Sequence, residues 1–61
     1  MMIKKIEQRR ERLGLSVAEA AGKAGLSRSG WHRITKGERV PKLETLQAMA
    51  KAVGLKLKIG I

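Results

Sequence analysis

The sequence predicts an all-α domain, a compact bundle of four helices followed by a short β-strand at the end of the chain. Three observations support this prediction. Apolar residues recur at helical spacing in four segments, and a glycine follows each segment. A serine stands directly before two of the segments, where a helix N-cap is expected. The remaining stretch, residues 55–61, alternates apolar with other residues, which is typical of a half-buried strand.

The chain of 61 residues is expected to form one domain, residues 1–61, without linkers or internal repeats. A chain this short covers only about 60% of the surface that its unfolded form exposes, so its core is small. It contains no cysteine, and therefore neither disulfides nor thiolate metal sites can stabilise it. Stability must come from well-packed helices or from association with another subunit.

The first two helices are predicted over residues 2–13 and 17–24. The apolar stripe of the first helix consists of Met2, Ile3, Ile6 and Leu13. Arg10 lies on the same stripe, which is an unusual place for a charged side chain. Before the second helix, Ser16 and Glu19 have the spacing of a capping box. The inner side of this helix carries Val17, Ala20, Ala21 and Ala24, small residues that allow another helix to approach closely.

The third helix is predicted over residues 28–36, with Ser27 as its N-cap. Its buried side consists of Gly30, Trp31 and Ile34. Its outer side spans an arc of about 140° and consists of Arg28, Ser29, His32, Arg33 and Lys36. This outer side is too basic and too rich in hydrogen-bond donors for a merely solvated surface. Trp31 has the chemistry to stack on a base, but its place beside Ile34 favours a role in the core.

The fourth helix is predicted over residues 43–53 and the strand over residues 55–61. The inner stripe of the helix consists of Leu43, Leu46, Met49, Ala50 and Val53. The apolar side of the strand consists of Leu55, Leu57, Ile59 and Ile61. One strand cannot form a sheet by itself, so we expect these four residues to pair with a second copy across a two-fold axis. The strand therefore predicts a homodimer.

The charge balance predicts a polyanionic partner. Fourteen Lys and Arg residues oppose five Asp and Glu residues, giving a net charge of +9. The cations are spread along a patterned sequence, as in a folded basic domain, and no apolar run is long enough to cross a bilayer. We therefore expect a cytoplasmic, nucleoid-associated protein that binds double-stranded DNA and no membrane.

Enzymatic and metal-dependent functions are not expected. One histidine and no cysteine give no metal-binding constellation, and no motif indicates a cofactor. The few acidic residues are scattered, and no nucleophile has a base placed beside it. Two short helices joined by a tight turn at Gly25-Leu26, in a chain this basic, instead predict a DNA-binding helix–turn–helix. The residues best placed to reach base edges in the major groove are Arg28, Ser29, His32 and Arg33.

The chain resembles the Cro/C1-type helix–turn–helix family of phage and bacterial regulators over residues 3–55. The matching residues are Leu13-Gly14-Leu15-Ser16, Glu19, Ala21, Gly25-Leu26-Ser27, Ile34, Gly37, Pro41 and Leu43-Glu44-Thr45-Leu46. The resemblance implies a λ-repressor-like fold that binds DNA as a dimer, with the third helix in the major groove. It implies base contacts by Arg28, Ser29 and Arg33. Phosphate contacts are assigned to Ser16, Val17, Ser27, Lys36, Arg39 and Lys42.

The sequence departs from the family pattern in three places. Val17 stands where members often have a glutamine that holds a phosphate, which leaves backbone N–H groups for this contact. Thr35 stands where members frequently have an acid that pairs with the arginine of the first helix. Arg10 must then bond to carbonyl groups or contact DNA. Finally, the predicted strand replaces the usual fifth helix, as in small plasmid and toxin–antitoxin regulators.

The function expected from these features is that of a dimeric, sequence-specific transcriptional regulator, a repressor that binds an inverted repeat. Two alternatives remain open. One is an antitoxin-like interaction protein whose main role is to bind a toxin-like or other protein partner, with DNA binding for autoregulation. The other is a non-specific binder of RNA or DNA, which unrelated DNA would compete away.

Overall fold

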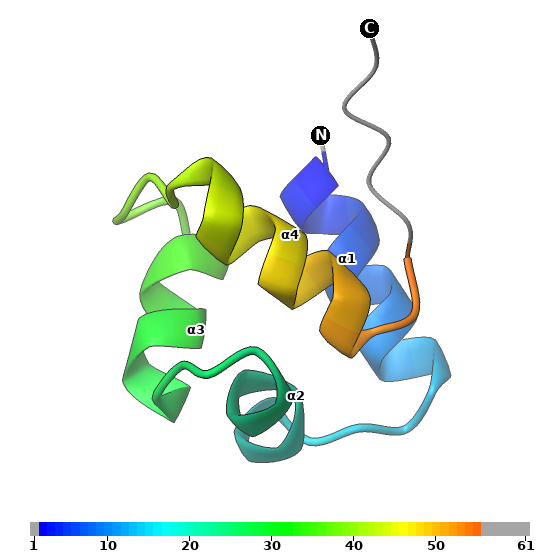
Figure 1. Ribbon diagram of the computed structural model, residues 1–61. Helices are drawn as coiled ribbons and strands as arrows, with labels where there is room; N and C mark the ends of the chain where they lie inside the picture. Colours follow the sequence, from blue (N-terminus) through cyan, green and yellow to red (C-terminus); the bar gives the residue numbers. More distant parts are fainter. Residues whose placement is uncertain (1, 56–61) are drawn as a thin grey trace, which may run out of the picture.

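A computed structural model describes residues 2–55 of the chain, which form four helices (Figure 1). Their bounds are α1 (Met2–Arg12), α2 (Val17–Lys23), α3 (Arg28–Thr35) and α4 (Leu43–Ala52). All four predicted helices are confirmed, and each prediction was one residue too long at its C-terminal end. In the last three helices that extra residue is the C-cap, which is only partly helical.

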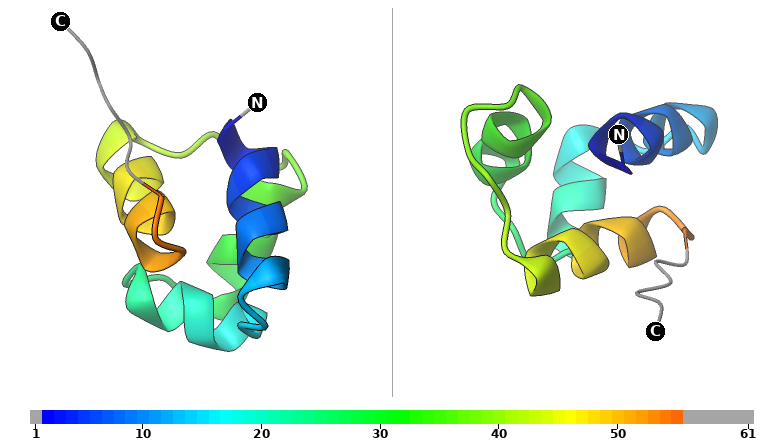
Figure 2. Two further views of the ribbon diagram at one scale, coloured as in Figure 1. Left: turned by 90° about the vertical axis from the view of Figure 1, so that its right-hand side faces the viewer. Right: turned by 90° about the horizontal axis from the view of Figure 1, so that it is seen from above.

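The helices surround a single cluster of buried side chains. Helix α2 lies across one end of the molecule, and α1, α3 and α4 stand around a common centre (Figures 1 and 2). Helix α2 packs against α3 and α4, and α1 packs against the same two helices. The buried cluster consists of Ile6, Ala20, Ala21, Trp31, Ile34, Met49, Ala50 and Val53. Every helix therefore contributes to the core.

Hydrogen bonds local in sequence determine where α2 and α3 begin. The hydroxyl oxygen of Ser16 accepts the Glu19 N–H at 3.0 Å, and the Glu19 carboxylate accepts the Ser16 N–H at 3.0 Å. The predicted capping box is therefore confirmed. Ser27 caps α3 in a simpler way, because its hydroxyl oxygen accepts the Gly30 N–H at 3.0 Å.

Each helix ends in the same glycine-based turn. After α2, Gly25 has a φ of 72°, a conformation that residues with a Cβ rarely adopt. The Leu26 N–H then donates to the Ala21 carbonyl at 2.8 Å, which identifies a Schellman motif. Helix α3 ends in the same way, because the Glu38 N–H donates to the Arg33 carbonyl at 2.8 Å. Both ends of α3 are thus bounded by fixed backbone geometry.

Leu55 belongs to the end of α4, contrary to the predicted strand. Its N–H donates to the Ala50 carbonyl at 2.8 Å, and its side chain packs, half buried, against the core of its own chain. An apolar residue is favoured here because it follows the glycine of a Schellman motif. The other predicted strand and dimer residues, Leu57, Ile59 and Ile61, lie outside the described residues.

Two predicted core residues are exposed instead. Leu13 is 50% exposed and Leu43 is 54% exposed. Leu13 follows the last residue of α1, so the helical projection that placed it on the apolar stripe does not apply there. Leu43 is the first residue of α4 and lies at the outer end of the inner stripe. The core is consequently smaller than the sequence pattern predicted.

Candidate nucleic-acid interface

Helix α3 has one polar exposed side and one buried side, as predicted. Gly30, Trp31 and Ile34 are buried. The exposed residues, named here the polar face of α3, are Arg28, Ser29, His32, Arg33 and Lys36. In residues 2–55 no side chain of this face makes a hydrogen bond or ion pair with another residue. Its donors are therefore available for an external partner.

The turn between α2 and α3 brings the two helices together. Leu26 is half buried and packs against the core, and Ser27 caps the next helix directly after it. Gly30 has little room for a side chain, because a Cβ there would come within 3.2 Å of the Ser27 hydroxyl oxygen. Such a Cβ would press on the hydroxyl that starts α3. The sequence Leu26-Ser27 and the small Gly30 thus fix where the polar face begins.

The residues assigned to phosphate contacts lie before and after the polar face of α3 in the sequence, except Lys36, which belongs to it. Ser16, Ser27, Lys36, Arg39 and Lys42 are exposed, whereas Val17 is half buried and packs against the core. The two serine hydroxyls each accept one backbone N–H bond, which leaves their O–H groups as donors. Val17 can offer only its backbone N–H, because its side chain faces inward.

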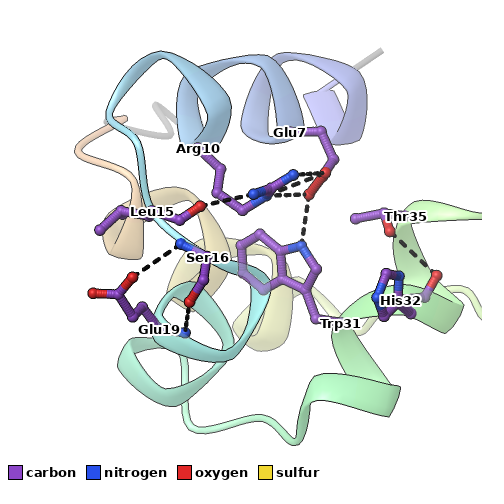
Figure 3. A network of polar contacts seen from close by, with 8 residues as sticks. All are labelled: Glu7, Arg10, Leu15, Ser16, Glu19, Trp31, His32 and Thr35. Carbon is purple, nitrogen blue, oxygen red and sulfur yellow. Dashed lines mark hydrogen bonds and ion pairs between the residues drawn. The ribbon is translucent and has the colours of Figure 1, made fainter.

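Trp31 is a core residue, as predicted. Its side chain is fully buried, so it is not available for stacking on a base. The indole N–H still needs an acceptor, because an unpaired buried donor is costly. It donates to a carboxylate oxygen of Glu7 at 2.7 Å (Figure 3). This bond joins α1 to α3.

Glu7 and Arg10 form a network that the sequence did not reveal. The guanidinium of Arg10 donates to Glu7 at 2.8 Å from Nε and 3.0 Å from Nη2. Its Nη1 donates to the Leu15 carbonyl at 2.7 Å (Figure 3). Of the two roles left open for Arg10, bonding to a carbonyl is therefore the one observed. Thr35 takes no part, because its hydroxyl donates to the His32 carbonyl at 3.2 Å.

The network shifts the ionisation of both charged groups. The pKa of Glu7 is lowered below its usual value, first by the bonds from Arg10 and then by the Trp31 indole, against the opposing effect of burial. The pKa of Arg10 is raised by the same carboxylate. The pKa of Glu19 is lowered mainly by the Ser16 backbone N–H in the capping box.

We expect the domain to lose stability in acid, partly through Glu7. Because the pKa of Glu7 is lower in the folded chain, its stabilising effect is complete above about pH 4.5 and is lost as the pH falls through the lowered pKa. Lys4, Lys36 and His32 add positive charge around it, and Arg10 stays ionised. The melting temperature of Glu7→Gln should therefore fall less steeply than that of the wild type between about pH 5 and pH 3. Melting temperatures that fall by the same amount in both proteins over this pH range would contradict the prediction.

A family model described as a helix-turn-helix domain matches residues 5–57. The chain belongs to this helix-turn-helix family. The match agrees with the resemblance to Cro/C1-type DNA-binding domains that the sequence motifs indicated. No curated protein and no solved structure gives a significant match to the chain.

Neither a cluster of metal-ligating side chains nor a membrane-spanning helix occurs in the part of the chain that the structure describes. Within residues 2–55, no three His, Cys, Asp or Glu side chains come together as a metal site would require. No described helix has the length and apolar content needed to span a membrane.

In this helix-turn-helix domain, α1 and α3 are connected by other residues than the ion pair that is frequent in members of the family. The acid that pairs with Arg10 is Glu7, which lies on the same helix. Its carboxylate also accepts the indole N–H of Trp31 and so connects α1 to α3. One signal in the sequence was available, because Glu7 lies three residues before Arg10, the spacing of a helical ion pair. The indole contact spans 24 residues and has no local signal.

Proposed function

We propose that this helix-turn-helix domain is a sequence-specific, DNA-binding transcriptional regulator, a repressor, that inserts α3 into the major groove. One observation carries the proposal, namely the polar face of α3, which is exposed on a helix whose other side is buried in the core. An α-helix fits the major groove, where every base pair has its own pattern of donors and acceptors. The net charge of +9 supports binding to a polyanion.

Base contacts are proposed for the first two turns of α3. Arg28 and Ser29 begin the helix, and His32 and Arg33 follow one turn later. An arginine can donate two hydrogen bonds to O6 and N7 of one guanine, so Arg28 and Arg33 are expected to specify sequence most strongly. Serine both donates and accepts, and it therefore discriminates less.

Phosphate contacts are proposed around this helix. The residues are Ser16, Val17 through its backbone, Ser27, Lys36, Arg39 and Lys42. The cations among them should give salt-dependent affinity without sequence preference, because they release counterions from the duplex. They would also hold α3 in register with the bases.

The experiment that tests this function is selection of bound duplexes from a random DNA pool by the purified protein. Enrichment of one inverted repeat, with half-sites about one helical turn apart or a multiple of it, is expected. A pool that stays random would favour the non-specific alternative. An enriched single half-site would retain sequence reading but contradict the dimer.

The dimer is proposed to form through Leu57, Ile59 and Ile61. Because Leu55 packs against its own core, a chain that ends at Leu55 keeps all the buried residues described above. We expect this shortened chain to sediment as a monomer at concentrations where the full chain is a dimer. It should keep the helical circular dichroism of the full chain. A shortened chain that remained fully dimeric would place the interface elsewhere.

The antitoxin-like alternative predicts a different result. A protein partner that co-purifies at a fixed ratio from the native cell would favour it. In that case, selection of DNA by the isolated chain should be weak, and adding the partner should strengthen it.

A further inference from the structure

The carboxylate of Glu7 connects α1 to α3, and we propose that Glu7 is a positioning residue that sets the orientation of α3 for DNA reading. The inference rests on the proposed function and adds to it a residue on α1 that is not part of the polar face of α3. The carboxylate bonds the Trp31 indole of α3 at 2.7 Å and the Arg10 guanidinium of α1 at 2.8 Å. Arg10 extends the network to the Leu15 carbonyl at 2.7 Å.

The bond to Trp31 can control the rotation of α3 about its own axis. Apolar packing of Trp31 and Ile34 holds the helix in the core, but such contacts have no direction. A hydrogen bond is directional and weakens steeply when its angle changes. Among residues 2–55, the bond from Trp31 to Glu7 is the only side-chain hydrogen bond between α3 and another helix. Glu7 therefore supplies the directional restraint.

The restraint acts where the proposed base contacts lie. Trp31 directly precedes His32 and lies between Arg28 and Arg33 in the sequence of α3. A rotation that breaks the indole bond must move these side chains with the same backbone. Contacts to base edges tolerate displacements of only about 0.5 Å or 10–20°. Phosphate contacts by long cationic side chains are less demanding, so loss of Glu7 should reduce discrimination more than general affinity.

Arg10 keeps the carboxylate in place. Two of its nitrogens bond to Glu7 and the third to Leu15, the residue before the Ser16 N-cap of α2. The ion pair of Glu7 and Arg10 on α1 is therefore bonded both to the residue before the N-cap of α2 and to α3. Figure 3 shows these residues converging between α1, the start of α2 and α3.

The test compares Glu7→Gln with Glu11→Gln. Both variants remove one negative charge from α1, and Glu11 is exposed and makes no side-chain hydrogen bond within the described residues. Affinities are measured for a duplex that the wild type has selected and for an unrelated duplex of equal length. Glutamine keeps one acceptor oxygen, but its NH2 group replaces the oxygen that accepts from Arg10 Nη2, so two donor groups face each other and the side chain must move. We therefore expect E7Q to lower the ratio of the two affinities about fivefold or more, and E11Q to keep the wild-type ratio. Affinity for the unrelated duplex should be equal in the two variants.

Whether Glu7 acts through the indole of Trp31 is tested with Trp31→Phe, which removes the indole donor. The E7Q/W31F double variant should have the same affinity ratio as W31F alone, because the side chain at position 7 cannot restrain α3 once the indole is absent. Trp31 is the only tryptophan of the chain, so its indole N–H gives one NMR resonance that reports the bond. This resonance should shift in E7Q and stay in place in E11Q.

Arg10→Lys gives a milder second variant if E7Q lowers stability too far. Lysine keeps the charge but cannot bond Glu7 and Leu15 together in the same planar geometry, so a smaller fall in the ratio is expected. The inference is overturned if E7Q and R10K keep the wild-type ratio, or if the losses of E7Q and W31F add in the double variant. A wild type that selects no sequence would overturn the proposed function and this inference with it.

Discussion

Replacing Trp31 with alanine is expected to lower the free energy of unfolding of the domain by about 3–5 kcal/mol. Trp31 is the largest of the fully buried side chains. Truncation of a buried tryptophan to alanine costs about 3–5 kcal/mol. A domain with about 0.05–0.15 kcal/mol of stability per residue has roughly 3–9 kcal/mol in total for 61 residues. The substitution would therefore remove a large share of the stability.

Thermal melting followed by circular dichroism measures this loss. Leu43→Ala is the matched control, because it also shortens an apolar side chain but one that is 54% exposed. Its melting temperature should lie close to that of the wild type. Trp31→Phe, which keeps a ring but loses the bond to Glu7, should melt between the wild type and W31A. A W31A protein with the melting temperature of the wild type would mean that burial of Trp31 contributes little to the stability of the core.

Replacing Arg33 with alanine is expected to relax sequence preference at one base position by about 1–3 kcal/mol. Arg33 is exposed, lies one turn into α3 and makes no side-chain bond to the described part of its own chain. The guanidinium can bond two acceptors of one guanine, and alanine leaves both unpaired. Arg28→Ala should have a similar effect at a different base position.

Lys36→Ala is the control for Arg33→Ala. Both substitutions remove one exposed cation from the same end of α3, but Lys36 is its C-cap and is assigned to a phosphate. K36A should weaken binding to all sequences alike and reduce the salt dependence by about one unit of slope. Titrations with a set of single-base variants of the selected duplex, at several salt concentrations, separate the two patterns. If R33A instead behaved as K36A is expected to, Arg33 would be a phosphate contact.

The helices could be predicted from the sequence because local residues determine them. Ser16, Ser27 and the glycines that follow each helix act on backbone groups only a few residues away. The projection that separated the two sides of α3 holds because the whole segment is helical. The same projection failed at Leu13 and Leu43, which lie at or beyond helix ends.

Long-range polar contacts could not be predicted in the same way. A glutamate on a basic helix reads as a solvated charge, and nothing near Glu7 indicates that an indole 24 residues later will need an acceptor. Leu55 was assigned to a strand because the alternation after it is regular, whereas the Schellman motif of α4 gives this leucine a place in the core. In both cases tertiary contacts determine the place of the residue, and the local sequence pattern does not reveal them.

The separation of the two sides of α3 has a consequence for how such a protein can diversify. The side chains that face outward form no bonds with the rest of the described structure, and Trp31, Ile34 and the capping residues hold the helix without them. Exchanging Arg28, Ser29, His32 or Arg33 should therefore change the target at little cost to folding. The buried and capping residues can therefore stay the same during evolution, while single substitutions of exposed residues on α3 change the DNA sequence that is recognised.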